Sequence, residues 1–82
     1  MKRSRGEIVA KILDICTEGA NKTRIVYQAN LNFRTVDPYL ETLIKNDLIE
    51  VRPGKYTIYE TTERGSNLLE TIGQVNNELR GF

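Results

Sequence analysis

Apolar residues recur in the first part of the chain at the spacing of an amphipathic helix. They lie three or four positions apart, with further apolar neighbours beside them: Ile8, Val9, Ile12, Leu13, Ile15 and Cys16. This spacing places an apolar stripe along one helical face, and it predicts a helix from about Ser4 to Thr17. Gly19 follows as a candidate C-cap, because glycine readily adopts the left-handed conformation that ends many helices.

Two further helical patterns follow. A second helix is predicted from Lys22 to Ala29, with Asn21 as its N-cap, since an Asn side chain accepts a hydrogen bond from an N–H of the first turn. A third helix is predicted from about Phe33 to Asn46. Its apolar residues again share one face, and they are Val36, Leu40 and Leu43.

Pro38 leaves two starting points open for the third helix. If the helix begins after Asn32, Pro38 lies beyond the first turn, where its missing N–H removes a hydrogen bond and favours a kink. If Asp37 is the N-cap, Pro38 occupies the favoured first helical position. We prefer the earlier start, because Val36 then falls on the apolar stripe.

After Asn46 the pattern changes to the alternation that is typical of strands. Short strands are predicted over Leu48–Arg52 and Tyr56–Thr61. The segment between them, Pro53-Gly54-Lys55, favours a loop longer than two residues, because a Pro-Gly type II turn does not match the twist of a tight hairpin.

A last helix is predicted from roughly Glu63 to Leu79, with Thr61 or Thr62 as its N-cap. The predicted order is helix, helix, helix, strand, strand, helix. The chain has 82 residues, of which 39% are hydrophobic, and this suffices for one small core. We therefore expect a single, mainly α domain with a small β-hairpin, in the α+β class.

Composition argues against an enzyme. The chain has no His and a single Cys, which excludes Ser-His and Cys-His catalysis and an internal disulfide, and disfavours a zinc site. Cys16 lies on the apolar stripe, so we expect a buried thiol. We predict no catalytic residues, metal, cofactor or small-molecule substrate. No apolar run is long enough to span a membrane and no signal-peptide pattern begins the chain, so we expect a cytoplasmic protein without a membrane partner.

Charge is unevenly distributed along the chain. The net charge is only +1, but residues 1–36 contain seven basic and three acidic residues, a net +4. Residues 37–82 contain five basic and eight acidic residues, a net −3. This asymmetry favours an anionic partner that binds the first part of the chain.

Two segments carry a family resemblance. Residues 31–49 run from an apolar turn residue through a polar cluster to a Leu-x-x-Leu pair and a Leu-Ile entry into the hairpin, with Leu31, Leu40, Leu43, Leu48 and Ile49 at those positions. Residues 59–65 form a Tyr-x-x-Thr-x-x-Gly link to the last helix. Over nearly the whole chain this pattern resembles small prokaryotic winged helix-turn-helix proteins, in particular archaeal ones that dimerise through a C-terminal coiled coil. Asp47 departs from the pattern, because Gly is usual at its position.

The resemblance implies that residues 1–62 form the winged helix-turn-helix domain and residues 63–82 a dimerisation helix. The third helix would then enter the major groove of DNA, with the hairpin as a wing on the backbone. Arg can bind guanine and Asn adenine through two hydrogen bonds, so we expect base contacts from the start of this helix, at Asn32, Arg34, Thr35, Pro38 and Thr42. Phosphate contacts are predicted at the start of the second helix and beside the wing tip, at Lys22, Thr23, Arg24, Arg52 and Lys55.

Each of these side chains also has a simpler interpretation as a solvated surface group. Asn32 can serve only as the N-cap of the third helix. Asp37 and Glu41 lie near the proposed DNA face and would repel phosphate, unless they point aside or disfavour wrong DNA sequences.

The last helix carries apolar residues at alternating spacings of four and three, which is the seam of a coiled coil: Leu68, Ile72, Val75, Leu79 and Phe82. We predict a homodimer through this seam, with parallel or antiparallel helices. Alternatively, Leu68, Leu69 and Ile72 pack on the first helix and the remainder frays.

Together these patterns predict a homodimeric protein that binds double-stranded DNA and regulates transcription. A chromatin-architecture protein that binds DNA without sequence preference is one alternative. A winged-helix module that binds other proteins is another, and it gains support if Lys22, Arg24, Arg34 and Lys55 do not share one face.

Overall fold

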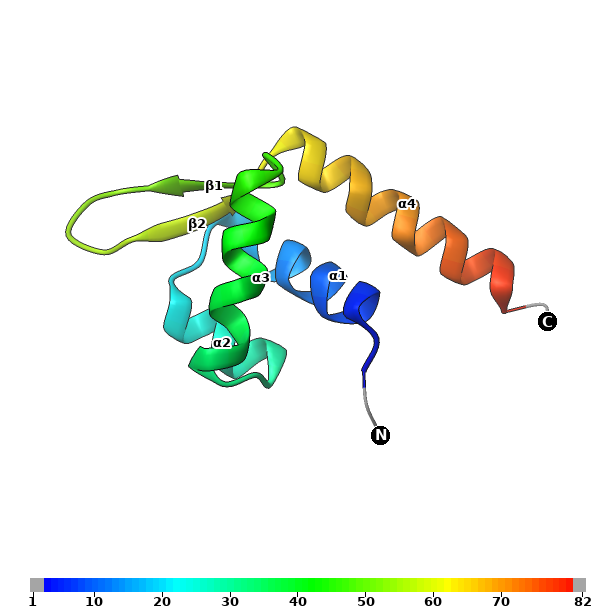
Figure 1. Cartoon of the computed structure of the whole chain (residues 1–82). Coiled ribbons are helices and arrows are strands. Elements are labelled where there is room, and N and C mark those ends of the chain that lie inside the picture. Colours follow the sequence, from blue (N-terminus) through cyan, green and yellow to red (C-terminus); the bar gives the residue numbers. More distant parts are fainter. Residues whose placement is uncertain (1–2, 81–82) are drawn as a thin grey trace.

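A computed structural model describes residues 3–80 (Figure 1). The predicted element order is confirmed, with these bounds: α1 (Arg5–Ile15), a 3₁₀ turn (Cys16–Glu18), α2 (Lys22–Ala29), α3 (Phe33–Lys45), β1 (Ile49–Arg52), β2 (Ile58–Thr61) and α4 (Glu63–Leu79). In Figure 1, α1, α2 and α3 form a compact group, the β1–β2 hairpin extends from it on one side, and α4 runs away from it on the other. The principal dimensions are 47 × 29 × 19 Å.

The core lies between the three helices and the base of the hairpin. It is formed by buried apolar residues of these elements, and it includes Ala20, which the sequence pattern placed in the segment after the first helix: Ile12, Leu13, Ile15, Cys16, Ala20, Ile25, Val26, Ala29, Val36, Leu40, Leu43 and Ile49. The Cys16 side chain has no exposed surface, which confirms the expected burial of the thiol. Burial disfavours the charged thiolate and raises the pKa of Cys16 from 9.0 to about 12, while the nearby Arg24 guanidinium lowers it.

Local capping explains where the helices start. The side-chain oxygens of Asn21 and Asn32 accept hydrogen bonds from the Arg24 and Thr35 N–H groups, at 2.8 and 2.7 Å. The earlier start of α3 is therefore confirmed, and Pro38 lies inside the helix. The end of the first helix was predicted too late, because α1 stops at Ile15 and the chain tightens into the 3₁₀ turn before it leaves through Gly19 at φ 90°.

The hairpin is shorter than the sequence pattern suggests. β1 pairs antiparallel with β2 in a register that sets Arg52 opposite Ile58, so residues 53–57 form the loop and Tyr56 is not part of the strand. The longer loop is confirmed. At the hairpin base, Ala20 and Tyr59 exchange two backbone hydrogen bonds of 2.9 and 2.8 Å, which attach the wing to the segment before α2.

The junction between the hairpin and α4 is tightly packed. The Thr62 hydroxyl caps α4 by accepting from the Gly65 N–H at 3.0 Å, and it donates to the Asp47 carbonyl at 2.6 Å. A Cβ on Gly65 would collide with the carbonyl oxygen of Leu48, which accounts for glycine there. Asp47, at the position where the resemblance implies Gly, adopts φ 60° in the left-handed region.

The two halves of α4 have different surroundings. Leu68 and Leu69 are partly buried against the core, and Ile72 is half-buried. Val75 and Leu79 farther along are 48% and 57% exposed, and Phe82 lies outside the described residues. No helix within residues 3–80 is long and apolar enough to cross a membrane.

Candidate nucleic-acid interface

The turn between α2 and α3 is built from backbone hydrogen bonds. Asn30 ends α2 in the left-handed conformation at φ 54°, and the Leu31 N–H donates to the Val26 carbonyl at 3.0 Å. The Arg3 guanidinium adds two further hydrogen bonds, to the carbonyls of Ala29 and Asn30 at 2.5 and 2.9 Å. A cation at the C-terminal end of a helix is favourable, so Arg3 holds the N-terminal segment against the turn.

The exposed face of α3 carries most of the predicted base-contact residues. Arg34, Pro38 and Thr42 are exposed, and Thr35 is half-buried. Pro38 lacks an N–H, so the Arg34 carbonyl has no partner at the usual position in the helix. The Asn32 side-chain oxygen is already engaged as the cap of α3, whereas recognition of adenine through two hydrogen bonds needs both its oxygen and its nitrogen.

A groove lies between the start of α2 and the wing, and we call it the wing groove. Its volume is about 370 Å³, and it is lined by Asn21, Lys22, Thr23, Lys55, Tyr56, Thr57 and Tyr59. Three of the predicted phosphate-contact residues therefore come together there: Lys22, Thr23 and Lys55. The first-turn N–H groups of a helix have no carbonyl partners within it, so the start of α2 adds backbone donors to the two lysines.

Lys22 at the wing groove is partly neutralised by an acidic side chain of α3. Its Nζ lies 2.7 Å from Asp37 Oδ1, and the two side chains are 37% and 51% exposed. The hydrogen bond that Lys22 donates to the Asp37 carboxylate is the largest cause that raises the pKa of Lys22 above 10.5. Asp37 thus points aside toward α2, while Glu41 lines a neighbouring hollow of about 290 Å³ together with Lys22 and Ile44.

The other two predicted phosphate-contact residues lie elsewhere. Arg24 lines a hollow between α1 and α2 together with Lys11, Asp14 and Glu18, apart from the wing groove. Arg52 forms an ion pair of 2.9 Å with Glu60 on the adjacent strand. The basic residues of the sequence prediction are therefore only partly gathered on one face.

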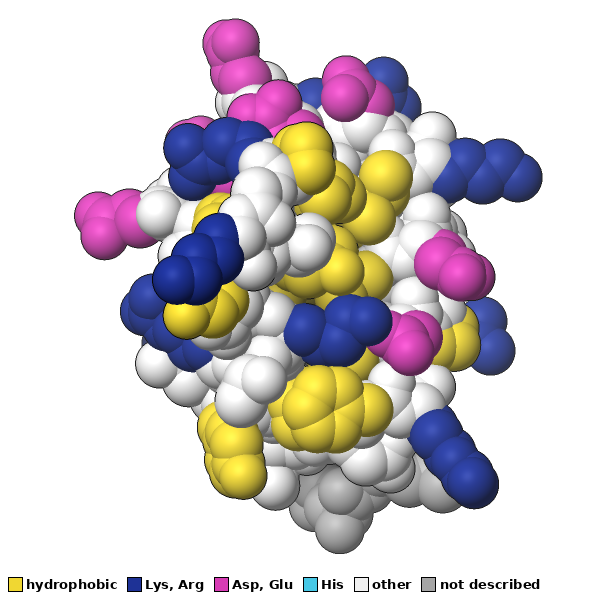
Figure 2. All heavy atoms as spheres, turned by 90° about the vertical axis from the view of Figure 1, so that its left-hand side faces the viewer, with side chains coloured by type: hydrophobic (Ala, Val, Ile, Leu, Met, Phe, Trp, Pro, Cys, Tyr) yellow, Lys and Arg dark blue, Asp and Glu magenta, His cyan; other side chains and the backbone are white. Residues whose placement is uncertain are grey.

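The face with the wing has a mixed surface. Figure 2 shows hydrophobic side chains near its centre, with Lys and Arg around them and Asp and Glu interspersed. Sequence reasoning missed the two tyrosines of the wing groove, Tyr56 and Tyr59, and the role of Arg3. The position of Tyr56 beside Lys55 was the available signal for the tyrosines, and the Lys55 Nζ lies 5.9 Å from the centre of that ring.

A three-helix core with a helix-turn-helix pair, followed directly by a two-stranded hairpin, defines the winged-helix class. The winged helix-turn-helix family model matches residues 2–80, so the chain belongs to this family, as the motifs predicted.

Two archaeal relatives come from Methanocaldococcus jannaschii, and both are uncharacterised proteins. MJ0287 is 40% identical over 72 residues, which are 87% of this chain and 71% of that protein. MJ0290 is 36% identical over 76 residues, which are 92% of this chain but only 35% of that protein, so the chain spans about a third of its length.

Among solved structures, the chain is similar to Sso10a-2, described as a DNA-binding protein from Sulfolobus solfataricus. The two share 30% sequence identity and superpose with a TM-score of 0.88, over 96% of this chain and 84% of the Sso10a-2 chain. The similarity therefore extends through the wing and into α4.

Proposed function

We propose that this protein binds double-stranded DNA, with α3 in the major groove and the wing on the phosphate backbone. The observation that carries the proposal is the wing groove, where Lys22 and Thr23 of α2 and Lys55 of the wing loop line one hollow. Lys22 also contacts Asp37 of α3, so the groove adjoins the proposed DNA-contacting helix. Phosphates favour such a combination of lysines, hydroxyls and helix N–H groups. Membership of the family and the similarity to a DNA-binding protein support it.

On α3, Arg34 is the side chain we assign to guanine, because its guanidinium is exposed on the outer face. Thr35, Pro38 and Thr42 lie beside it and offer methyl and ring carbons for apolar contact with thymine methyl groups. Such base contacts would give the protein a sequence preference, and we propose that it regulates transcription in the cytoplasm.

We further propose a homodimer through α4. Val75 and Leu79 continue the apolar stripe of Leu68 and Ile72 beyond the part of α4 that packs on the core. About half of each side chain is exposed, and a second copy of the helix would cover them. Phe82, the last residue of the predicted seam, lies outside the described residues. A dimer presents two copies of α3 at a fixed spacing, as a two-part DNA site requires.

Salt dependence tests the DNA-binding proposal. With about 6–8 phosphate contacts per dimer, the logarithm of affinity should fall with the logarithm of salt concentration at a slope of roughly −5 to −7. Lys55→Ala should weaken all duplexes equally and flatten the slope. Arg34→Ala should lose the preference for a duplex selected from a random pool over its scrambled form. Arg64→Ala on α4 is the matched control, and absence of duplex binding at low salt would contradict the proposal.

The dimer has its own test. Val75→Glu should convert the protein to a monomer in analytical ultracentrifugation, because it introduces a charge into the apolar seam. The neighbouring exposed Gln74→Glu adds the same charge on another side of α4 and should leave the dimer intact. Equal masses for both variants and the unchanged protein would argue against this interface.

A module that binds other proteins is the second candidate function. The observation that favours it is the position of Arg24, which does not share the wing groove with Lys22 and Lys55. The Lys22–Asp37 pair also reduces the positive charge of that groove. A chromatin-architecture role differs from regulation only in sequence preference, and the duplex selection separates the two.

A further inference from the structure

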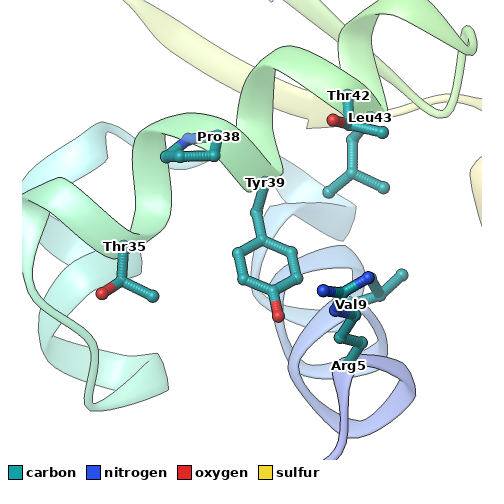
Figure 3. Close-up of a pocket in the computed structure, with 7 residues that line it drawn as sticks. All are labelled: Arg5, Val9, Thr35, Pro38, Tyr39, Thr42 and Leu43. Carbon is teal, nitrogen blue, oxygen red and sulfur yellow. The ribbon is translucent and has the colours of Figure 1, made fainter.

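A second pocket lies between α1 and α3, apart from the wing groove (Figure 3). Its volume is about 480 Å³, within the range of about 300–1,000 Å³ that is usual for small-molecule sites. α1 contributes two of the lining residues and α3 the other five, which are, in chain order, Arg5, Val9, Thr35, Pro38, Tyr39, Thr42 and Leu43. The sequence assigned none of them to a small-molecule ligand, although Thr35, Pro38 and Thr42 are among the predicted DNA base contacts.

The walls combine an apolar surface with one positive charge. In Figure 3 the Tyr39 side chain extends from α3 toward α1, where Val9 and Arg5 lie, and Leu43 lies above them. The Tyr39 ring is half-buried and packs against the core, so it is held in place. Arg5 is the one charged residue in the lining, and within residues 3–80 it forms no ion pair. No carboxylate balances this guanidinium inside the pocket.

We propose that this pocket binds a small aromatic carboxylic acid of one or two rings. The flat ring would contact Val9 and the Tyr39 ring, where it is removed from water. The carboxylate would accept two hydrogen bonds from the Arg5 guanidinium, whose planar fork matches the geometry of a carboxylate. The hydroxyl groups of Thr35 and Thr42 offer further polar contacts at the rim.

The acid and a DNA duplex would compete. Thr35, Pro38 and Thr42 form one wall of the pocket, and the same three residues are assigned to base contacts above. This step rests on the proposed function. An acid at ten times its own dissociation constant should raise the apparent Kd of the duplex about eleven-fold per protomer, because the two ligands exclude each other.

Binding of the acid is tested first, without DNA. Titration calorimetry of the full chain with naphthoate should show binding, and the Val9 methyl and Tyr39 ring resonances should shift in NMR spectra. Arg5→Gln should weaken naphthoate about ten-fold and leave the neutral naphthalenemethanol unchanged, since only the charged group depends on the guanidinium. Arg64→Gln removes the same charge outside the pocket and should leave both affinities unchanged. No naphthoate binding, or equal naphthoate affinity in Arg5→Gln, overturns the site.

A displacement experiment then separates the two proposals. A fluorescent duplex bound to the protein should be released by naphthoate at a concentration at which naphthalenesulfonamide, a neutral aromatic of similar size that lacks the carboxylate, releases little of it. If naphthoate binds at the pocket without releasing the duplex, the proposed competition between the acid and DNA is refuted. Failure of the protein to bind any duplex refutes the proposed function alone, because calorimetry and NMR report on the pocket independently.

Discussion

Asp37→Asn should strengthen DNA binding by releasing Lys22. In the structure Asp37 Oδ1 lies 2.7 Å from the Lys22 Nζ, and Lys22 lines the wing groove where we expect phosphate. The substitution keeps the size of the side chain and removes one negative charge from the proposed DNA face. It also leaves the ammonium without its carboxylate partner, so that a phosphate can take its place.

The expected magnitudes follow from exposure. Both side chains are more than a third exposed, so loss of the ion pair should change the free energy of unfolding by less than about 1 kcal/mol. One additional phosphate contact per protomer should steepen the slope of log affinity against log salt by about 0.9. A charge interaction of about 1 kcal/mol near water corresponds to roughly five-fold tighter binding at low salt.

Fluorescence anisotropy of a labelled duplex over a series of salt concentrations measures both quantities, and thermal unfolding followed by circular dichroism checks the fold. Glu70→Gln is the matched control, because it makes the same charge change at an exposed position of α4. If the two variants change the slope equally, the effect is one of net charge only. If Asp37→Asn weakens binding, Asp37 orients Lys22 for phosphate, and the reasoning fails.

Two further predictions concern stability. Gly65→Ala should lower the free energy of unfolding by about 1–3 kcal/mol in urea denaturation, because its Cβ would meet the Leu48 carbonyl. Gly73→Ala on the same helix has open space around the new Cβ, so it should raise the free energy of unfolding by about 0.5–1 kcal/mol. Equal effects of the two substitutions would contradict the close approach at Gly65. Burial raises the pKa of Cys16 from 9.0 to about 12, so the folded state keeps a proton that the unfolded chain loses above pH 9.0. The stability that comes from this retained proton is fully present below pH 9.0 and is lost toward pH 12 by about 1.4 kcal/mol per pH unit. The difference in free energy of unfolding between the unchanged protein and Cys16→Ala, measured from pH 9 to 12, should show this slope.

Sequence reasoning located the helix starts well, because each start is set by residues that are close together in the chain. Asn21, Asn32 and Thr62 each cap a helix three residues before the N–H they bind, and this spacing is visible in the chain. The start of β2 was misplaced at Tyr56 because alternation of residue types says nothing about where the partner strand ends. The register that pairs Arg52 with Ile58 decides this.

The site was only partly predictable for a similar reason. Lys22 and Arg24 lie close together in the sequence, on either side of Thr23. Successive helix residues point about 100° apart, however, and Arg24 lies outside the wing groove. The Lys22–Asp37 and Arg52–Glu60 pairs depend on how the elements pack, which no local pattern records. The pocket between α1 and α3 arises from residues that are as far apart in the chain as Arg5 and Leu43.

The hydrogen bonds at Thr62 have a mechanical consequence. The Thr62 hydroxyl links the Asp47 carbonyl, just before β1, to the first turn of α4, and Gly65 packs closely against the Leu48 carbonyl, so these contacts hold the start of α4 against the base of the wing. In the proposed dimer, the distance and the rotation between the two winged-helix domains are then set by the length of α4. Each residue inserted into the exposed half of α4 would move one winged-helix domain about 1.5 Å along the helix axis and turn it by about 100° around that axis. The length of α4 would therefore select the spacing between the two DNA half-sites.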